Sequence, residues 1–381
     1  MPSTDESRSI DRAVSQALAS IGHPRRLTIL VNDPQRHTDT RSVLEALTPR
    51  IDTGKSRILV ATGSHSFSET QRQTFERDLV QGLPFGVVSW HDARAGDLVP
   101  VPDGAWRCHP WLLEDRPVLA IGSVEPHYFA GFTGAQKTAT VGCASYADIE
   151  ANHSGALMPD CRPCRLAESP VYEGVAEMLG VLRRVQGVAA VNLVQAGPKV
   201  LAAAGGEPLA SLNALIPIAE RTFVRRIGRP VDALIAEVTG PLGDTFYQAD
   251  KGIKNNEWAV RDGGALVLVA PCPGGIGQDH FYQLLRQAPT YADAAAVVKA
   301  RGYRLGDHKA VRLRYLTDPR CRNVRVYVVS DGLSPEDAAV LGFTKVATTE
   351  DALRQAAVDR SGQGLHHVRD AGNVCVTSTV A

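Results

Sequence analysis

The chain has 381 residues, more than the roughly 250 to 300 residues at which a single hydrophobic core stops growing, so two domains are expected. Its 44% hydrophobic and 22% charged residues exclude a disordered or fibrous protein. The 41 basic residues balance the 41 acidic ones, which gives no electrostatic reason to expect a nucleic acid or an anionic membrane as a partner. We therefore expect the partner to be a small molecule or a second copy of the chain, as in a homo-oligomer.

The N-terminus and the cysteines predict a cytoplasmic protein. Residues 1–14 are polar and lack the basic start and apolar run of a secretory signal. No apolar run approaches the roughly 18 residues that span a bilayer. The seven cysteines are scattered along a chain without such a signal, which argues against a disulfide framework.

The first half of the chain alternates short β-branched runs with segments of helical period. Such alternation predicts a largely parallel sheet with helices on both faces. The predicted strands are residues 27–32 (LTILVN), 57–62 (RILVAT), 84–90 (PFGVVSW), 117–124 (PVLAIGSV) and 188–194 (VAAVNLV). The predicted helices between them are residues 39–47 and 68–80.

A second α/β series follows a charged stretch with Gly-Pro punctuation at residues 222–230, where we place the domain boundary. The fold class is therefore α/β, with two domains, 1–225 and 226–364, and the active site in the crevice between them. Residues 365–381, which include the strand-like run 373–379, are expected to pack back on the first domain. The predicted elements of the second series are strands at 231–238, 264–271 and 324–330, with a helix near 245–260.

Reactive side chains directly follow the predicted strands of the first domain. Ligands of open α/β sheets bind beyond the carboxyl ends of the strands, so these positions are the informative ones. A single histidine at a strand end is more often a helix cap or a satisfied polar contact. Histidines at four successive strand ends indicate a shared crevice. The residues are Asp33, Arg36 and His37 after the first strand, His65 after the second, His91 and Asp92 after the third, and His127 and Lys137 after the fourth.

The run from 126 to 142, PHYFAGFTGAQKTATVG, is typical of a turn that holds a phosphate group. Gly131 and Gly134 let the backbone pass close to a bound group and start a helix, and Lys137 follows one turn later. Neither a Walker A spacing nor a dinucleotide fingerprint is present. The alternative is a glycine-rich turn with a solvated lysine.

The segment after this turn offers two kinds of metal site. Cys161 and Cys164 form one C-x-x-C pair, which with His153 and Cys143 could be a structural zinc site, although no second pair completes it. Alternatively, His153 after Asn152 is a lone imidazole ligand to a metal whose other ligands come from a cofactor.

In the second domain, Tyr247, Gln248 and Lys251 lie just past the first strand. Lys251 suits a substrate carboxylate if it points into the crevice, whereas a solvated lysine is the commoner outcome. A second strand end, at residues 270–277, is rich in glycine and proline.

Five blocks in this order resemble the nickel-pincer lactate racemase family. They are NDPQR after the first strand, TGSH after the second, PHYFAGFTGAQK after the fourth, NH at 152–153, and YQADK in the second domain. The sequence departs from the family pattern at Ala135, where the family commonly has a second glycine.

The resemblance implies the nickel-pincer nucleotide (nickel pyridinium-3,5-bisthiocarboxylic acid mononucleotide) as cofactor, with Ni as its metal. It implies that His153 is the protein ligand of the nickel and that Lys137 carries the cofactor in a thioamide linkage. His65 and His127 would be the paired acid/base residues. The remaining positions would bind the cofactor phosphate and the substrate carboxylate: Asp33, Arg36, Tyr247, Gln248 and Lys251, beside the turn glycines Gly131 and Gly134.

The function implied is that of an isomerase, a racemase or epimerase that inverts C2 of a lactate-like 2-hydroxy acid by reversible hydride transfer. Two bases on opposite faces of C2, each of near-neutral pKa, suit that reaction, and histidine fits both. Two alternatives remain open. One is a nicotinamide-dependent 2-hydroxy acid dehydrogenase, against which the missing dinucleotide fingerprint counts. The other is a nickel-cofactor binding protein without turnover.

Overall fold

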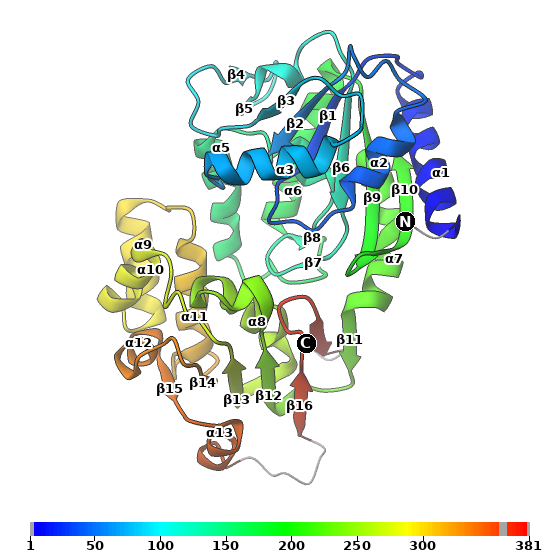
Figure 1. The fold of residues 1–381 in the computed structure, drawn as a ribbon. Coiled ribbons are helices and arrows are strands. Elements are labelled where there is room, and N and C mark those ends of the chain that lie inside the picture. The colour runs from blue at the N-terminus through cyan, green and yellow to red at the C-terminus, as the bar shows by residue number, and fades with distance from the viewer. Residues whose placement is uncertain (1–3, 358–363, 379–381) are drawn as a thin grey trace. The chain divides into compact units, whose positions relative to one another are not determined.

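The computed structural model describes residues 4–357 and 364–378 (Figure 1). The chain forms two compact units. The first unit comprises Met1–Glu125, Ala130–Gly155 and Cys164–Thr222. The second comprises Pro126–Phe129, Ala156–Pro163 and Phe223–Ala381. No helix among the described residues is long and apolar enough to cross a membrane.

The first unit is built on a six-stranded sheet of order β10-β9-β6-β1-β2-β3. Its pairs are parallel, except that the edge strand β10 runs antiparallel to β9. The central strands are buried along most of their length, as expected for a parallel sheet covered on both faces. The strands are β1 (Thr28–Asn32), β2 (Arg57–Ala61), β3 (Val88–Trp90), β6 (Val118–Ser123), β9 (Val188–Ala196) and β10 (Lys199–Gly206).

Helices cover both faces of this sheet. On one face the core is formed with α1 (Thr4–Ser20), α2 (Thr40–Leu47) and α3 (Glu69–Val80). The N-caps Asp39 and Ser68 start α2 and α3 by accepting backbone N–H groups, and Ser68 forms a full capping box with Gln71. The remaining helices of this half are α4 (Ala135–Ala139), α5 (Tyr146–Ser154), α6 (Pro170–Val185) and α7 (Pro208–Phe223).

Short elements complete the first half of the chain. They are the strands β4 (Val99–Pro100), β5 (Arg107–Cys108), β7 (Pro126–His127) and β8 (Gly131–Phe132), and the 3-10 turns η1 (Pro110–Leu112) and η2 (Gly155–Leu157).

The second unit has a five-stranded, all-parallel sheet of order β15-β14-β13-β12-β16. Its strands are β12 (Val231–Glu237), β13 (Val260–Val269), β14 (Arg325–Val329), β15 (Phe343–Lys345) and β16 (Leu365–Val368). The larger core lies under α8 (Phe246–Asn256), α9 (Asp279–Gln287), α10 (Tyr291–Arg301), α11 (Asp307–Thr317) and α12 (Pro335–Leu341), whereas α13 (Thr349–Gln355) covers the other face. The 3-10 turns η3 (Gly240–Gly243) and η4 (Glu257–Ala259) flank α8.

The end of the chain differs from the expectation. Strand β16 pairs with β12, and β17 (Cys375–Ser378) pairs with β11 (Val224–Ile227), so the described part of residues 365–381 belongs to the second unit. The expectation that this segment packs on the first domain is wrong for these residues. The apolar run alone could not say which sheet edge it would join.

Candidate functional site

The strand order of the first sheet reverses beside β1, because β2 and β3 follow on one side of it and β6 and β9 on the other. At such a switch point the connections leave in opposite directions and open a crevice beyond the carboxyl ends of the strands. The residues that follow β1 and β2, and the segment from Ala130 onward after β6, lie in the first unit, whereas Pro126–Phe129 belongs to the second.

Asp33 and His65 form a pair at this place. The Asp33 carboxylate lies 2.8 Å from Nδ1 of the His65 ring. The carboxylate is buried, with 5% of its side chain exposed, while 42% of the His65 side chain is exposed. A carboxylate at Nδ1 fixes the tautomer and leaves Nε2 as the basic atom. Asp33, expected at the cofactor phosphate or substrate carboxylate, is seen here to support His65.

Helix α4 carries Lys137 and is hydrogen-bonded to residues of β9 and β1. The side chain of Asn192 accepts a hydrogen bond from Ala135 N at 2.8 Å, and Thr138 Oγ1 donates to Asn32 Oδ1 at the end of β1, also at 2.8 Å. Burial, with a smaller contribution from the charge of Arg36, lowers the pKa of the Lys137 amine to about 7. A lysine in this setting is substantially neutral near neutral pH, which is the form that acts as a nucleophile.

Gly131 and Gly134 have conformations that favour glycine, with φ of +70° and +154°. A Cβ on Gly131 would lie 2.4 Å from the Arg165 carbonyl oxygen, and one on Gly134 would lie 2.3 Å from Gln136 Oε1. Gly131 is thus required by close packing against backbone, whereas Gly134 is favoured by its positive φ, since the end of the Gln136 side chain can move. Their expected role in the approach of a phosphate group stays a prediction.

His153 lies in the last turn of α5, whose N-cap Ser145 accepts from Asp148 N. Its side chain is half-buried, and burial followed by the charge of Lys137 lowers the pKa of the imidazole to about 3. The charge of His65 acts in the same direction. The structure therefore brings both Lys137 and His65 within electrostatic reach of His153, whose imidazole is neutral.

Among residues 4–357 and 364–378, no group of three or more His, Cys, Asp or Glu side chains comes together as a metal site. Cys161 is buried and Cys164 half-buried, and neither forms a disulfide. Cys161 also groups with the second unit and Cys164 with the first. The described residues therefore offer no zinc site around the C-x-x-C pair.

The remaining predicted residues belong to the second unit. His127 is buried with 6% exposure in the segment Pro126–Phe129. Tyr247, Gln248 and Lys251 lie on α8, beyond the carboxyl end of β12, where the second sheet has its own switch point between β12 and β16. The two histidines expected to act as acid and base are therefore carried by different units. The crevice between the domains stays a prediction.

His37 and His91 were expected at the same crevice, and His91 does not fit that expectation. Its Nε2 lies 2.9 Å from the Ala144 carbonyl oxygen and the side chain is only 1% exposed. Burial lowers the pKa of His91 to about 4, so this ring is a neutral structural contact. His37 is exposed.

The sequence analysis missed a set of buried polar residues on α11. His308, Lys309 and Arg312 are 3%, 7% and 7% exposed. Lys309 Nζ lies 4.0 Å from the centre of the Tyr247 ring and donates to the Tyr247 carbonyl oxygen. The helix has no apolar periodicity that would have marked it, because it is buried on nearly all sides and its buried charged residues alternate with apolar ones such as Ala310 and Leu313.

Comparison with known proteins identifies relatives of this chain. The family model described as lactate racemase N-terminal domain matches residues 2–162, and the one described as lactate racemase C-terminal domain matches residues 229–370. A lactate racemase of Thermoanaerobacterium thermosaccharolyticum is 28% identical over 73% of this chain and 67% of its own. One of Lactiplantibacillus plantarum is 29% identical over 65% of this chain and 60% of its own.

Solved structures show the same fold. The lactate racemase apoprotein of T. thermosaccharolyticum superposes with a TM-score of 0.85 at 22% identity, over 97% of this chain and 92% of that one. A Thermotoga maritima protein superposes with a TM-score of 0.73 at 16% identity, over 98% of both chains. At these identities the likeness concerns the fold.

Proposed function

Because the chain belongs to the lactate racemase family, we propose that it is an isomerase that interconverts the two enantiomers of lactate or a closely related 2-hydroxy acid. The observation that carries the proposal is the arrangement at the first switch point. His65 there is supported by the buried carboxylate of Asp33. The neutral imidazole of His153 lies within electrostatic reach of both His65 and Lys137.

The residues of the first unit fit a nickel-pincer nucleotide. His153 would bind the nickel, since its ring is neutral and its lone pair available. With no cluster of further ligands among the described residues, the other ligands of the metal would come from the cofactor. Lys137 would carry the covalent linkage, and Arg36 would bind the phosphate group. When bound, this group supplies an acceptor for the hydrogen on C2.

The two histidines would handle only the hydroxyl proton of the substrate. His65 takes it up at Nε2 when one enantiomer reacts, and Asp33 stabilises the imidazolium that forms. His127 supplies a proton to the same substrate oxygen when hydrogen returns to C2 on its other face. When the opposite enantiomer reacts, the two exchange roles, so every turnover uses both residues.

Tyr247, Gln248 and Lys251 would hold the substrate carboxylate. Tyr247 and Lys251 are half-buried and Gln248 is exposed at the start of α8. A lysine ammonium pairs with a carboxylate as a point charge, while the amide and the phenol fix its orientation.

The test is enantiomer conversion by full-length protein produced in a host that makes the nickel cofactor. We expect L-lactate, or another 2-hydroxy acid, to reach an equal mixture of enantiomers without added nicotinamide. A strict requirement for a nicotinamide coenzyme would favour the dehydrogenase. Bound nickel without conversion of any 2-hydroxy acid would favour a cofactor-binding protein.

A further inference from the structure

The ring of His127 packs against two aromatic neighbours. It stacks on that of Tyr128, with centroids 5.1 Å apart and planes 16° apart. The ring of Phe129 meets it edge-on at 4.5 Å. Successive side chains of a strand point to opposite faces, so two neighbouring rings can stack only because the chain turns after β7 ends at His127. Such an arrangement needs contacts that keep Tyr128 in place.

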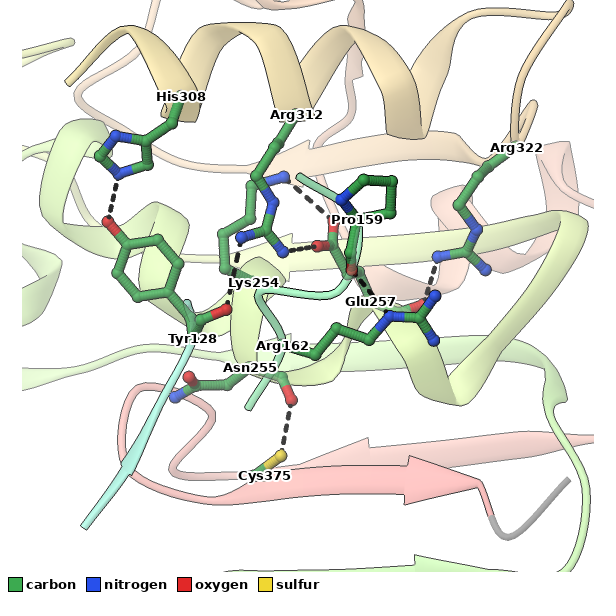
Figure 2. Close-up of polar contacts among 10 residues, drawn as sticks. All are labelled: Tyr128, Pro159, Arg162, Lys254, Asn255, Glu257, His308, Arg312, Arg322 and Cys375. Atoms are coloured by element: carbon green, nitrogen blue, oxygen red, sulfur yellow. Dashed lines mark hydrogen bonds and ion pairs between the residues drawn. The ribbon is translucent and has the colours of Figure 1, made fainter. Parts of the chain in front are cut away.

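Helix α11 supplies contacts to both ends of Tyr128 (Figure 2). Nε2 of His308 lies 3.1 Å from the Tyr128 hydroxyl, and Arg312 Nη1 donates to the Tyr128 carbonyl oxygen at 3.4 Å. Arg312 is in turn fixed by Glu257, whose carboxylate lies 3.2 Å from Arg312 Nη2 and 3.0 Å from Lys254 Nζ. The Tyr128 ring is therefore anchored to the core of the second unit.

His308 is itself held at its second nitrogen. Nδ1 lies 2.7 Å from the hydroxyl of Tyr303, so the ring joins two tyrosine hydroxyls. A neutral imidazole has one donor and one acceptor nitrogen, and this matches two hydroxyl groups that can each donate or accept. The Phe129 ring packs against the same imidazole at 4.9 Å. His308 is 3% exposed, and such a ring, fixed from two sides, cannot rotate without losing a hydrogen bond in the core.

We propose that Tyr128 and His308 are positioning residues for His127, an inference that rests on the proposed function. The His308 bond fixes the Tyr128 ring, and the ring fixes the plane of the His127 imidazole toward one face of the substrate. Catalytic groups must be held within fractions of an ångström, because a displacement of about 1 Å can cost roughly 10²-fold in rate. We therefore expect Tyr128 and His308 to affect kcat and to have little effect on KM, because other residues bind the substrate.

The test is steady-state kinetics, in both directions, on loaded full-length protein. His308→Leu removes the contact, whereas His308→Gln keeps a polar atom near the position of Nε2. We expect His308→Leu and Tyr128→Phe each to lower kcat by roughly 10-fold with KM within about 2-fold, and His308→Gln to stay within about 3-fold of the wild type. The double variant should be no slower than either single one, because the two changes remove the same bond.

Tyr315→Phe is the matched control, since Tyr315 is on the same helix and packs against Tyr291 at 5.3 Å. It should leave kcat unchanged. Full kcat in His308→Leu and Tyr128→Phe would overturn the inference, as would a loss in His308→Gln as large as in His308→Leu. Losses that multiply in the double variant would also overturn it. If His308→Leu does not fold, the milder Tyr128→Phe decides, because it deletes one oxygen atom.

A second readout separates this inference from the proposed function. Ring signals of His127 can be followed by NMR in the full-length protein without substrate, assigned by their loss in His127→Ala. We expect them to broaden or shift in Tyr128→Phe and His308→Leu, and to stay in place in Tyr315→Phe. Unchanged signals would overturn the positioning role. A wild type that converts no 2-hydroxy acid would instead reject the proposed function.

Discussion

The carboxylate of Asp33 lies 2.8 Å from Nδ1 of His65, although 32 positions separate the two residues in the chain. Strands β1 and β2 pair in parallel with Asn32 opposite Ala61, so the segments that follow them leave the sheet side by side. The pair gives His65 a fixed tautomer and a countercharge for its protonated form.

Asp33→Asn keeps the shape of the side chain but removes its charge, so the imidazolium of His65 loses its stabilisation and the tautomer is no longer fixed. We expect kcat to fall by about 10²-fold or more in both directions, with a smaller effect on KM. Asp39→Asn is the control, because asparagine caps α2 as well as aspartate does. Equal rates for Asp33→Asn and wild type would remove the pair from the mechanism.

His153→Ala should abolish nickel retention while the fold persists, because a ligand is lost but no core side chain. The nickel content is measured by metal analysis of protein purified from a cofactor-producing host. Thermal unfolding of the same samples checks that the variant is folded. His37→Ala, a change at an exposed histidine, should retain nickel at the wild-type level. Wild-type nickel occupancy in His153→Ala would exclude this residue as the ligand.

Lys309 should make stability depend on pH. Its pKa is lowered from 10.5 to about 8, mainly by burial. The charge of Asp250 opposes this shift, and the charges of Lys254 and Lys251 add to it. Between these two values the unfolded chain holds a proton that the native state has released. The free energy of unfolding therefore rises with pH from about 8 toward 10.5 through this residue. Below about pH 8 both states are protonated and the contribution is constant.

The measurement is urea unfolding of wild type and Lys309→Met from pH 7 to 9.5. The difference in unfolding free energy, wild type minus variant, should increase above about pH 8. Lys299→Met, at an exposed lysine of α10, controls for the loss of a surface lysine. Parallel curves for wild type and Lys309→Met would contradict the assignment.

Glu257 should be essential for the stability of the second unit. Burial alone would raise its pKa, but the charges of Lys254 and Arg312 and the hydrogen bond from Lys254 outweigh burial and lower it. Glu257→Gln removes the carboxylate that is hydrogen-bonded to two buried cations, Lys254 and Arg312, and should cost about 3 to 5 kcal/mol. Arg354→Gln, in a pair with Asp351 in which the arginine is 75% exposed, should cost less than about 1 kcal/mol. The free energy of unfolding of both variants is measured by urea unfolding. Similar losses of stability in Glu257→Gln and Arg354→Gln would contradict this role of Glu257.

Much of the fold could be predicted from the sequence where strands are apolar and central. The runs at 57–62 and 117–124 correspond to β2 and β6, since buried parallel strands are continuous apolar stretches. Helix α1 was not predicted, because the N-terminal segment was considered only as a targeting signal. Its buried residues nevertheless follow helical spacing and would have marked it: Ile10, Ala13, Val14, Ala17 and Leu18.

The candidate site was only partly predictable. The sequence predicted that Asp33 and His65 follow neighbouring strands. It could not predict their direct contact, because that depends on the conformation of the loops. His91 and His65 look alike in sequence, since each follows a strand, and only the structure shows one bonded to a buried carbonyl and the other exposed. The sequence did not mark α11, because charged and apolar residues are mixed on a helix that is buried on nearly all sides, which leaves no amphipathic pattern.

The central claim is that the C2 hydrogen travels as hydride while His65 and His127 move only the hydroxyl proton. The most direct test is the fate of deuterium at C2 of the substrate when loaded protein converts one enantiomer to the equal mixture in ordinary water. The account predicts that the inverted product retains most of the deuterium at C2. Complete exchange with solvent hydrogen would contradict it, because the C2 hydrogen would then have left as a proton to a solvent-exchanging base.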